Sequence, residues 1–144
     1  MSVGALYEAL RGTLDGAGVW GERCYADMAP AGVERPYAVW FVAGGGEANV
    51  RGDRADAAYT VTVKCVADAL AAATVGASQI HSALNDRGAG DRRTGLVQPA
   101  DGWTISTVTA GRVVYLVEWF EGTQAIYHYG YQFDVRMEAE SGYS

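Results

Sequence analysis

The chain has 144 residues and a formal net charge of −6 at pH 7, with 49% hydrophobic and 19% charged residues. This length suits one domain spanning residues 1–144, and the composition excludes a disordered chain. The acidic balance argues against a groove that grips nucleic acid, and no apolar run approaches the ~18 residues of a membrane span.

The N-terminal residues predict an amphipathic helix. Leu6, Leu10 and Leu14 recur at helical spacing behind Ser2, a candidate N-cap, and the glycines after position 15 end the pattern. The segment lacks the basic start and the continuous apolar core of a signal peptide. We expect this helix to lie on a sheet that covers its leucines.

Three strands are expected between this helix and a second one. Apolar and β-branched residues alternate in the segments 19–25, 36–43 and 57–66. In the middle segment Trp40 and Phe41 point to opposite faces, so both faces of the sheet should be at least partly covered. Residues 44–56 contain a glycine triplet and predict a loop or a flexible hairpin tip.

The second half of the chain predicts one helix, one long loop and three strands. An alanine-rich apolar stripe indicates a helix capped by Asp68 and running to about Asn85. Residues 85–102 are the most loop-like segment of the chain. The strands are expected at 103–109, 112–120 and 124–137, separated by turns at Ala110-Gly111 and Glu121-Gly122.

These elements predict an α+β fold. The order α-β-β-β-α-β-β-β favours a mainly antiparallel or mixed sheet of about six strands, with two helices packed on one face. The last strand alternates most cleanly, and its aromatic row should lie under the helices. This row comprises Tyr127, Tyr129, Tyr131 and Phe133.

The sequence offers no convincing catalytic, cofactor or metal site. His81 and His128 are the only histidines and have no ligand spacing between them, so we interpret both as structural. Cys24 and Cys65 are interpreted as buried thiols, although a disulfide stays open if their strands are adjacent. No serine sits at a strand-to-helix elbow, and the glycine triplet lacks the rest of a phosphate loop. We therefore expect no enzyme activity.

One segment carries a more specific signal. Residues 20–42 read as a strand, a corner and a second strand, and the corner holds Pro30, Gly32 and then Pro36-Tyr37. This pattern resembles the tail terminator, or tail completion, proteins of long-tailed bacteriophages. The likeness extends to the leucine helix, the strand and helix over 61–84, and the tyrosine-rich last strand.

The resemblance implies a structural virion protein without catalytic residues or cofactors. Such proteins form a homo-oligomeric ring, commonly a hexamer, that caps the tail tube, ends its growth and joins it to the neck of the head. Implied partners are other copies of the chain, the tail tube protein and a head completion or neck protein. DNA passes through the lumen without specific binding, no membrane is involved, and assembly takes place in the cytoplasm of the host bacterium.

The outer strand of the sheet and the two expected loops are candidate contacts with subunits or partners, because a closed ring requires two different complementary surfaces on each subunit. The candidate residues in the loops are Gly44, Gly45, Gly46, Arg51, Asp53, Arg54, Arg87, Arg92 and Arg93.

Other functions stay open at this point. Within the virion, the chain could be another neck component or a tail-tube component that stacks rather than caps. A different class is a small-molecule-binding α+β domain, which requires a deep pocket with convergent polar groups. A nucleic-acid binder would need a basic face, and the net charge argues against one.

Overall fold

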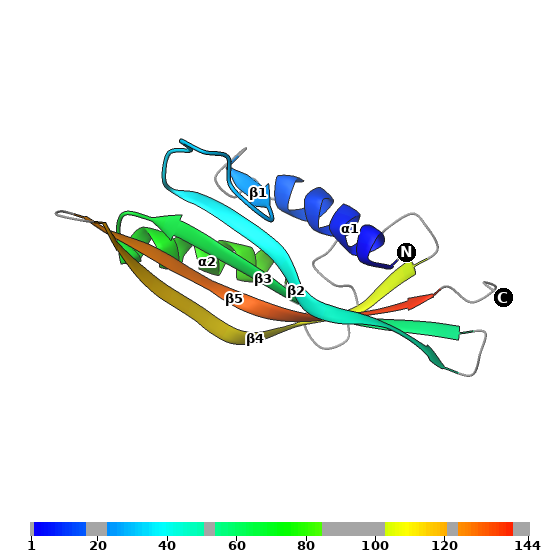
Figure 1. Ribbon diagram of the computed structural model, residues 1–144. Coiled ribbons are helices and arrows are strands. Elements are labelled where there is room, and N and C mark those ends of the chain that lie inside the picture. The colour runs from blue at the N-terminus through cyan, green and yellow to red at the C-terminus, as the bar shows by residue number, and fades with distance from the viewer. Residues whose placement is uncertain (1, 17–22, 51–53, 85–102, 121–123, 140–144) are drawn as a thin grey trace.

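The computed structural model describes residues 2–16, 23–50, 54–84, 103–120 and 124–139. Two helices and five strands follow one another along the chain (Figure 1). They are α1 (Ser2–Gly16), β1 (Cys24–Ala26), β2 (Tyr37–Val50), β3 (Arg54–Ala67), α2 (Leu70–Leu84), β4 (Trp103–Phe120) and β5 (Gln124–Ala139).

The strands form one mixed sheet in the order β1-β2-β3-β5-β4. Only β1 pairs in parallel with its neighbour, and the other three pairings are antiparallel. This arrangement confirms the predicted α+β class and the mainly antiparallel sheet.

Both helices cover the same face of the sheet. Trp40 on β2, Val63 on β3 and Tyr131 on β5 are register neighbours and therefore share a face. The ring of Tyr7 on α1 lies 5.1 Å from that of Trp40, and the ring of His81 on α2 lies 4.9 Å from that of Tyr131. We call this side the helix face, and the opposite side the open face.

The core lies between the helices and the helix face. The predicted leucine stripe of α1 is fully buried there, together with Ile80 and Leu84 of α2. Trp40 and Phe133 are the largest side chains that are almost completely buried. Burial of each such side chain contributes about 1.5–3 kcal/mol, which explains why two short helices stay on the sheet.

Two predictions about the strands were wrong. Residues 103–109 and 112–120 form one strand, β4, because a bulge between Ala110 and Val113 absorbs the extra residues without reversing the chain. The sheet therefore has five strands rather than about six. Segment 44–56 is not a loop where the structure describes it, because 44–50 continue β2 and 54–56 begin β3.

The other boundaries differ by a few residues. The first strand is limited to Cys24–Ala26 within the described residues, since 17–22 lie outside them. The second helix begins at Leu70, and the Asp68 carboxylate accepts a hydrogen bond from Arg35 Nε at 2.5 Å. The predicted long loop at 85–102 lies outside the described residues.

The proline-containing corner between β1 and β2 is attached to both helices. The Tyr7 hydroxyl of α1 donates a hydrogen bond of 2.7 Å to Asp27 Oδ1, at the start of the corner. The Arg35–Asp68 pair joins the end of the corner to the residues before α2. Gly32 turns the chain with a φ of 80°, as its place in the pattern predicts.

Candidate self-association surface

Strand β4 is the last strand of the sheet and carries a row of exposed apolar side chains. The exposed fraction is 53% for Val113, 54% for Tyr115, 50% for Leu116 and 77% for Trp119. Singly exposed apolar residues are ordinary, but contiguous ones mark a contact surface. We call residues Val113–Trp119 the β4 strip.

The β4 strip is exposed because α2 does not reach it. This helix lies over β3 and β5, as Figure 1 shows, and leaves the outer strand uncovered. Three residues of the strip stand on the helix face beside α2, because their register partners on β5 lie on that face. The pairs are Val113–Tyr131, Tyr115–Tyr129 and Trp119–Ala125.

A row of aromatic rings links this strip to the core. The ring centroids of Tyr115 and Tyr129 are 6.0 Å apart, those of Tyr129 and Tyr131 are 6.1 Å apart, and those of Tyr131 and Phe133 are 6.3 Å apart. Tyr131 and Phe133 of the predicted aromatic row thus lie under α2 as expected, and Tyr115 extends the row to the edge of the sheet. The strip is therefore anchored on a packed base rather than on a free loop.

The open face beside the strip holds a buried histidine. His128 on β5 lies against the carboxylate of Glu118 on β4. Burial lowers the pKa of His128, the nearby Lys64 ammonium lowers it further, and Glu118 opposes both effects. The ring therefore favours the neutral form.

Helix α2 offers a second uncharged surface. Its described sequence contains no Asp, Glu, Lys or Arg, although one side of it faces solvent. Val75 is 58% exposed on that side. A helix that presents alanine, serine and valine to water gains nothing from ion pairs, and the absence of charged side chains on this side suits a contact with another protein.

The predicted contact residues are only partly described. Gly44, Gly45 and Gly46 lie in β2, next to a bulge between Val42 and Gly44. Gly45 has a φ of 123°, and a Cβ there would lie 2.1 Å from the Ala58 carbonyl oxygen, so this position requires glycine for structural reasons. Arg54 begins β3. The other candidates, Arg51, Asp53, Arg87, Arg92 and Arg93, lie outside the described residues.

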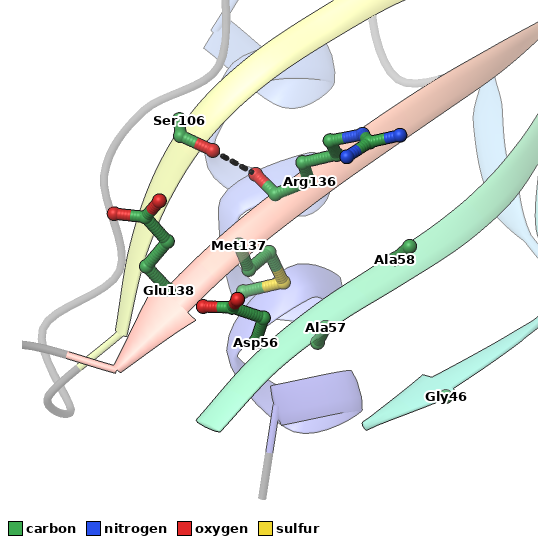
Figure 2. Close-up of a pocket in the computed structure, with 8 residues that line it drawn as sticks. All are labelled: Gly46, Asp56, Ala57, Ala58, Ser106, Arg136, Met137 and Glu138. Atoms are coloured by element: carbon green, nitrogen blue, oxygen red, sulfur yellow. Dashed lines mark hydrogen bonds between the residues drawn. The ribbon is translucent and has the colours of Figure 1, made fainter. Parts of the chain in front are cut away.

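A small cavity of about 180 Å³ lies at the end of the sheet near the β2–β3 hairpin (Figure 2). Its lining residues are Gly46, Asp56, Ala57, Ala58, Ser106, Arg136, Met137 and Glu138. Ligand sites usually measure ~300–1,000 Å³, so this hollow is too small for most metabolites. It does not favour the small-molecule-binding alternative.

The chemistry of this cavity is also limited. Ser106 Oγ donates a hydrogen bond of 3.1 Å to the backbone oxygen of Arg136 rather than to a base. Figure 2 shows the Arg136 side chain pointing away from the carboxylates of Asp56 and Glu138. A nucleophile without an adjacent base is not activated, so this arrangement supports no covalent catalysis.

The titratable groups of the described segments form no metal centre. Within these segments no three His, Cys, Asp or Glu side chains cluster closely enough to hold an ion. No disulfide joins Cys24 and Cys65, and each pairs in register with Ala38, so one strand separates them. Burial, with a smaller contribution from Cys24, raises the pKa of Cys65 to about 12. Neither described helix is long and apolar enough to cross a bilayer.

Sequence reasoning named the outer strand of the sheet as a candidate contact surface but did not identify that strand as β4. The sequence does show apolar residues on both faces of this segment, for example Tyr115 and Leu116, which is a signal of a strand covered on both sides. Only the strand order reveals that this strand is at the edge and stays exposed in a single copy.

Comparison with known proteins agrees with the fold. The virion of a native gene transfer agent particle contains a chain that superposes with a TM-score of 0.61 at 21% identity, over 94% of this chain and 93% of that one. At this identity the likeness shows a shared fold. No curated protein matches the sequence.

A family model described as "Tail completion protein gp17" matches residues 4–116, which span α1 to the middle of β4. This match confirms the resemblance read from the corner and the leucine helix. It covers well over half of the chain and includes most of the β4 strip. The chain therefore belongs to the tail completion protein gp17 family and is a structural protein of a virion tail.

Proposed function

We propose that the protein is a tail terminator that assembles as a homo-oligomeric ring, expected to be a hexamer, on the last layer of the tail tube. The ring ends tube growth and offers a surface to a head completion or neck protein. Its role is structural and not enzymatic, and assembly takes place in the cytoplasm of the host bacterium.

The observation that carries this proposal is the family membership. Its physical support is the β4 strip, together with the uncharged outer side of α2. A chain that leaves Tyr115 and Trp119 in water as a single copy has apolar surface available for a partner. A ring uses two different surfaces of each subunit, and the strip and α2 are candidates for one or both. The loop residues predicted from the sequence remain candidates too.

The charge of the chain suits the proposed lumen. DNA would pass through the ring with no specific contact, and a net charge of −6 keeps the phosphate backbone from adhering to it. The whole chain of 144 residues would act as one tail-terminator-like domain.

The test is a deletion of the gene followed by complementation, with tails examined by electron microscopy. We expect overlong tails without the protein and normal tails after return of the wild type. The variant Tyr115→Ser/Trp119→Ser should fail to restore length, whereas Met28→Ser should succeed, because Met28 is 80% exposed but lies in the corner.

The outcome distinguishes the alternatives. Absence of any tail after deletion would point to a neck or tail-tube component instead. Purified protein that stays off isolated tubes at every concentration would count against capping itself.

A further inference from the structure

From Val113 to Trp119, the outer edge of β4 pairs with no other strand in the described part of the chain. An edge strand presents unpaired N–H and C=O groups, and long apolar edges tend to pair with another strand. β4 has 18 residues and no proline, and both of its bulges lie before Val113, so the segment Val113–Trp119 is regular and suited to such pairing. The question is which strand suits it.

The sequence around Tyr115 is complementary to itself. If two copies of Gly111–Trp119 run antiparallel with Tyr115 opposite Tyr115, then Val113 faces Val117 and Val114 faces Leu116. In both pairs an apolar side chain faces another apolar side chain. Cross-strand pairs of this kind stabilise a sheet.

The charges match in the same register. Arg112 of one copy lies opposite Glu118 of the other, and because the pairing is two-fold this match occurs twice. Both side chains are exposed, and the Glu118 carboxylate, which already contacts His128 of its own chain, would be shared between the two partners. Centring the pair one residue earlier or later places each charge opposite an apolar residue.

The residues at the two ends of the segment are also compatible with this register. Trp119, which is 77% exposed, lies opposite Gly111 of the second copy. Gly111 sits in the bulge and has no side chain, so the indole can cover it. An aromatic side chain over a cross-strand glycine is a known stabilising arrangement.

We propose that the free protein forms a two-fold dimer in which the outer edges of β4 pair antiparallel about Tyr115. This goes beyond the proposed ring, because a two-fold contact joins two copies and then stops. It covers the edge before assembly and does not depend on whether the protein caps tubes.

The first test is site-directed cross-linking of the full chain in a Cys24→Ser background. In the proposed register the Tyr115→Cys variants face each other at the ~4.4–6.8 Å Cα separation that a disulfide needs. We expect them to form a covalent dimer under mild oxidation. The matched control is Val113→Cys, which is equally exposed but lies four residues from its own copy, or ~13 Å away.

A mixture of Val113→Cys and Val117→Cys should cross-link, because these two positions face each other. Cross-linking of Tyr115→Cys that does not exceed that of Val113→Cys would overturn the register. Circular dichroism of each variant ensures that a negative result does not come from unfolding.

The second test is charge reversal, read as the dimer dissociation constant by light scattering over a range of concentrations. Arg112→Glu or Glu118→Arg alone should raise this constant by about tenfold, because each creates two like-charge pairs. Mixing the two variants should restore dimers, because the mixed pair has both matches again.

Arg11→Glu on the exposed side of α1 is the control for net charge and should leave the constant unchanged. Wild-type protein that is monomeric throughout, or reversal variants that are not rescued by mixing, would refute the proposal. Neither result would bear on tube capping, which the complementation experiment measures.

Discussion

Gly130 is the position where the smallest substitution should do the most damage. It lies in β5 opposite Lys64 in the centre of the sheet. A Cβ added there would lie 1.9 Å from the Val63 carbonyl oxygen and 2.5 Å from the Lys64 Cα. Both contacts are with backbone, so no side-chain rotation relieves them. The backbone of Gly130 is outside the left-handed region, and the cost of Gly130→Ala is therefore steric.

The magnitude follows from the distance the strands must separate. The Val63 oxygen has to recede by at least about 1 Å before the contact is tolerable, which stretches the adjacent β3–β5 hydrogen bonds. Loss of about two such bonds at ~1 kcal/mol each, with ~1–3 kcal/mol of overpacking, gives a destabilisation of roughly 3–5 kcal/mol. At ~2–4 °C per kcal/mol for a domain of this size, the Tm should fall by roughly 6–20 °C.

Thermal unfolding followed by circular dichroism measures this, with Gly4→Ala as the control. Gly4 is in α1 with nothing within 4 Å of its added Cβ, so alanine there should raise stability by up to about 0.5–1 kcal/mol. A Gly130→Ala protein that melts within about 2 °C of the wild type would refute the steric argument, because the two strands would then have to separate at almost no cost.

Three further predictions concern the core and the titrating groups. Phe133→Ala should cost about 3–5 kcal/mol by urea denaturation, because the ring is 1% exposed; a cost below about 1 kcal/mol would contradict the described core. The pKa of His128 is lowered in the fold, so the folded protein binds this proton less readily than the unfolded chain, and stability present at pH 7 should fall as the pH drops below ~6.5. The urea midpoint of His128→Gln should therefore fall less between pH 7 and pH 5 than that of the wild type. Equal falls in the two proteins would contradict the assignment. Cys24 should react with a thiol reagent at pH 8 in the native protein while buried Cys65, with its pKa of about 12, reacts only after unfolding, so Cys24→Ser should abolish the native reaction.

Local patterns predicted much of this fold. The leucines of α1 and the aromatic row of β5 lie where their spacing indicates, because each pattern is satisfied by burial on one side. The corner with Pro30 and Gly32 also carried the family assignment. Each of these patterns depends on residues close together in the sequence, so local rules are enough to predict the structure that it forms.

The errors come from long-range pairing. Ala110-Gly111 has the composition of a turn, but a bulge uses the same residues, and only the pairing of β4 along the whole of β5 decides between them. Gly44 to Gly46 read as a loop because glycine has no preference of its own, yet Gly45 lies against Tyr59 in a paired strand. Strand order decides which strand is exposed, and no local pattern contains it.

The corner between β1 and β2 has a mechanical consequence. It is tied to α1 through Tyr7–Asp27 and to the residues before α2 through Arg35–Asp68, while Met28 protrudes from it. A load applied at Met28 would be divided between α1 and the residues before α2. Added salt should weaken the Arg35–Asp68 ion pair more than the Tyr7–Asp27 hydrogen bond, because salt screens the attraction between charges. The corner should therefore become less stiff as the ionic strength rises.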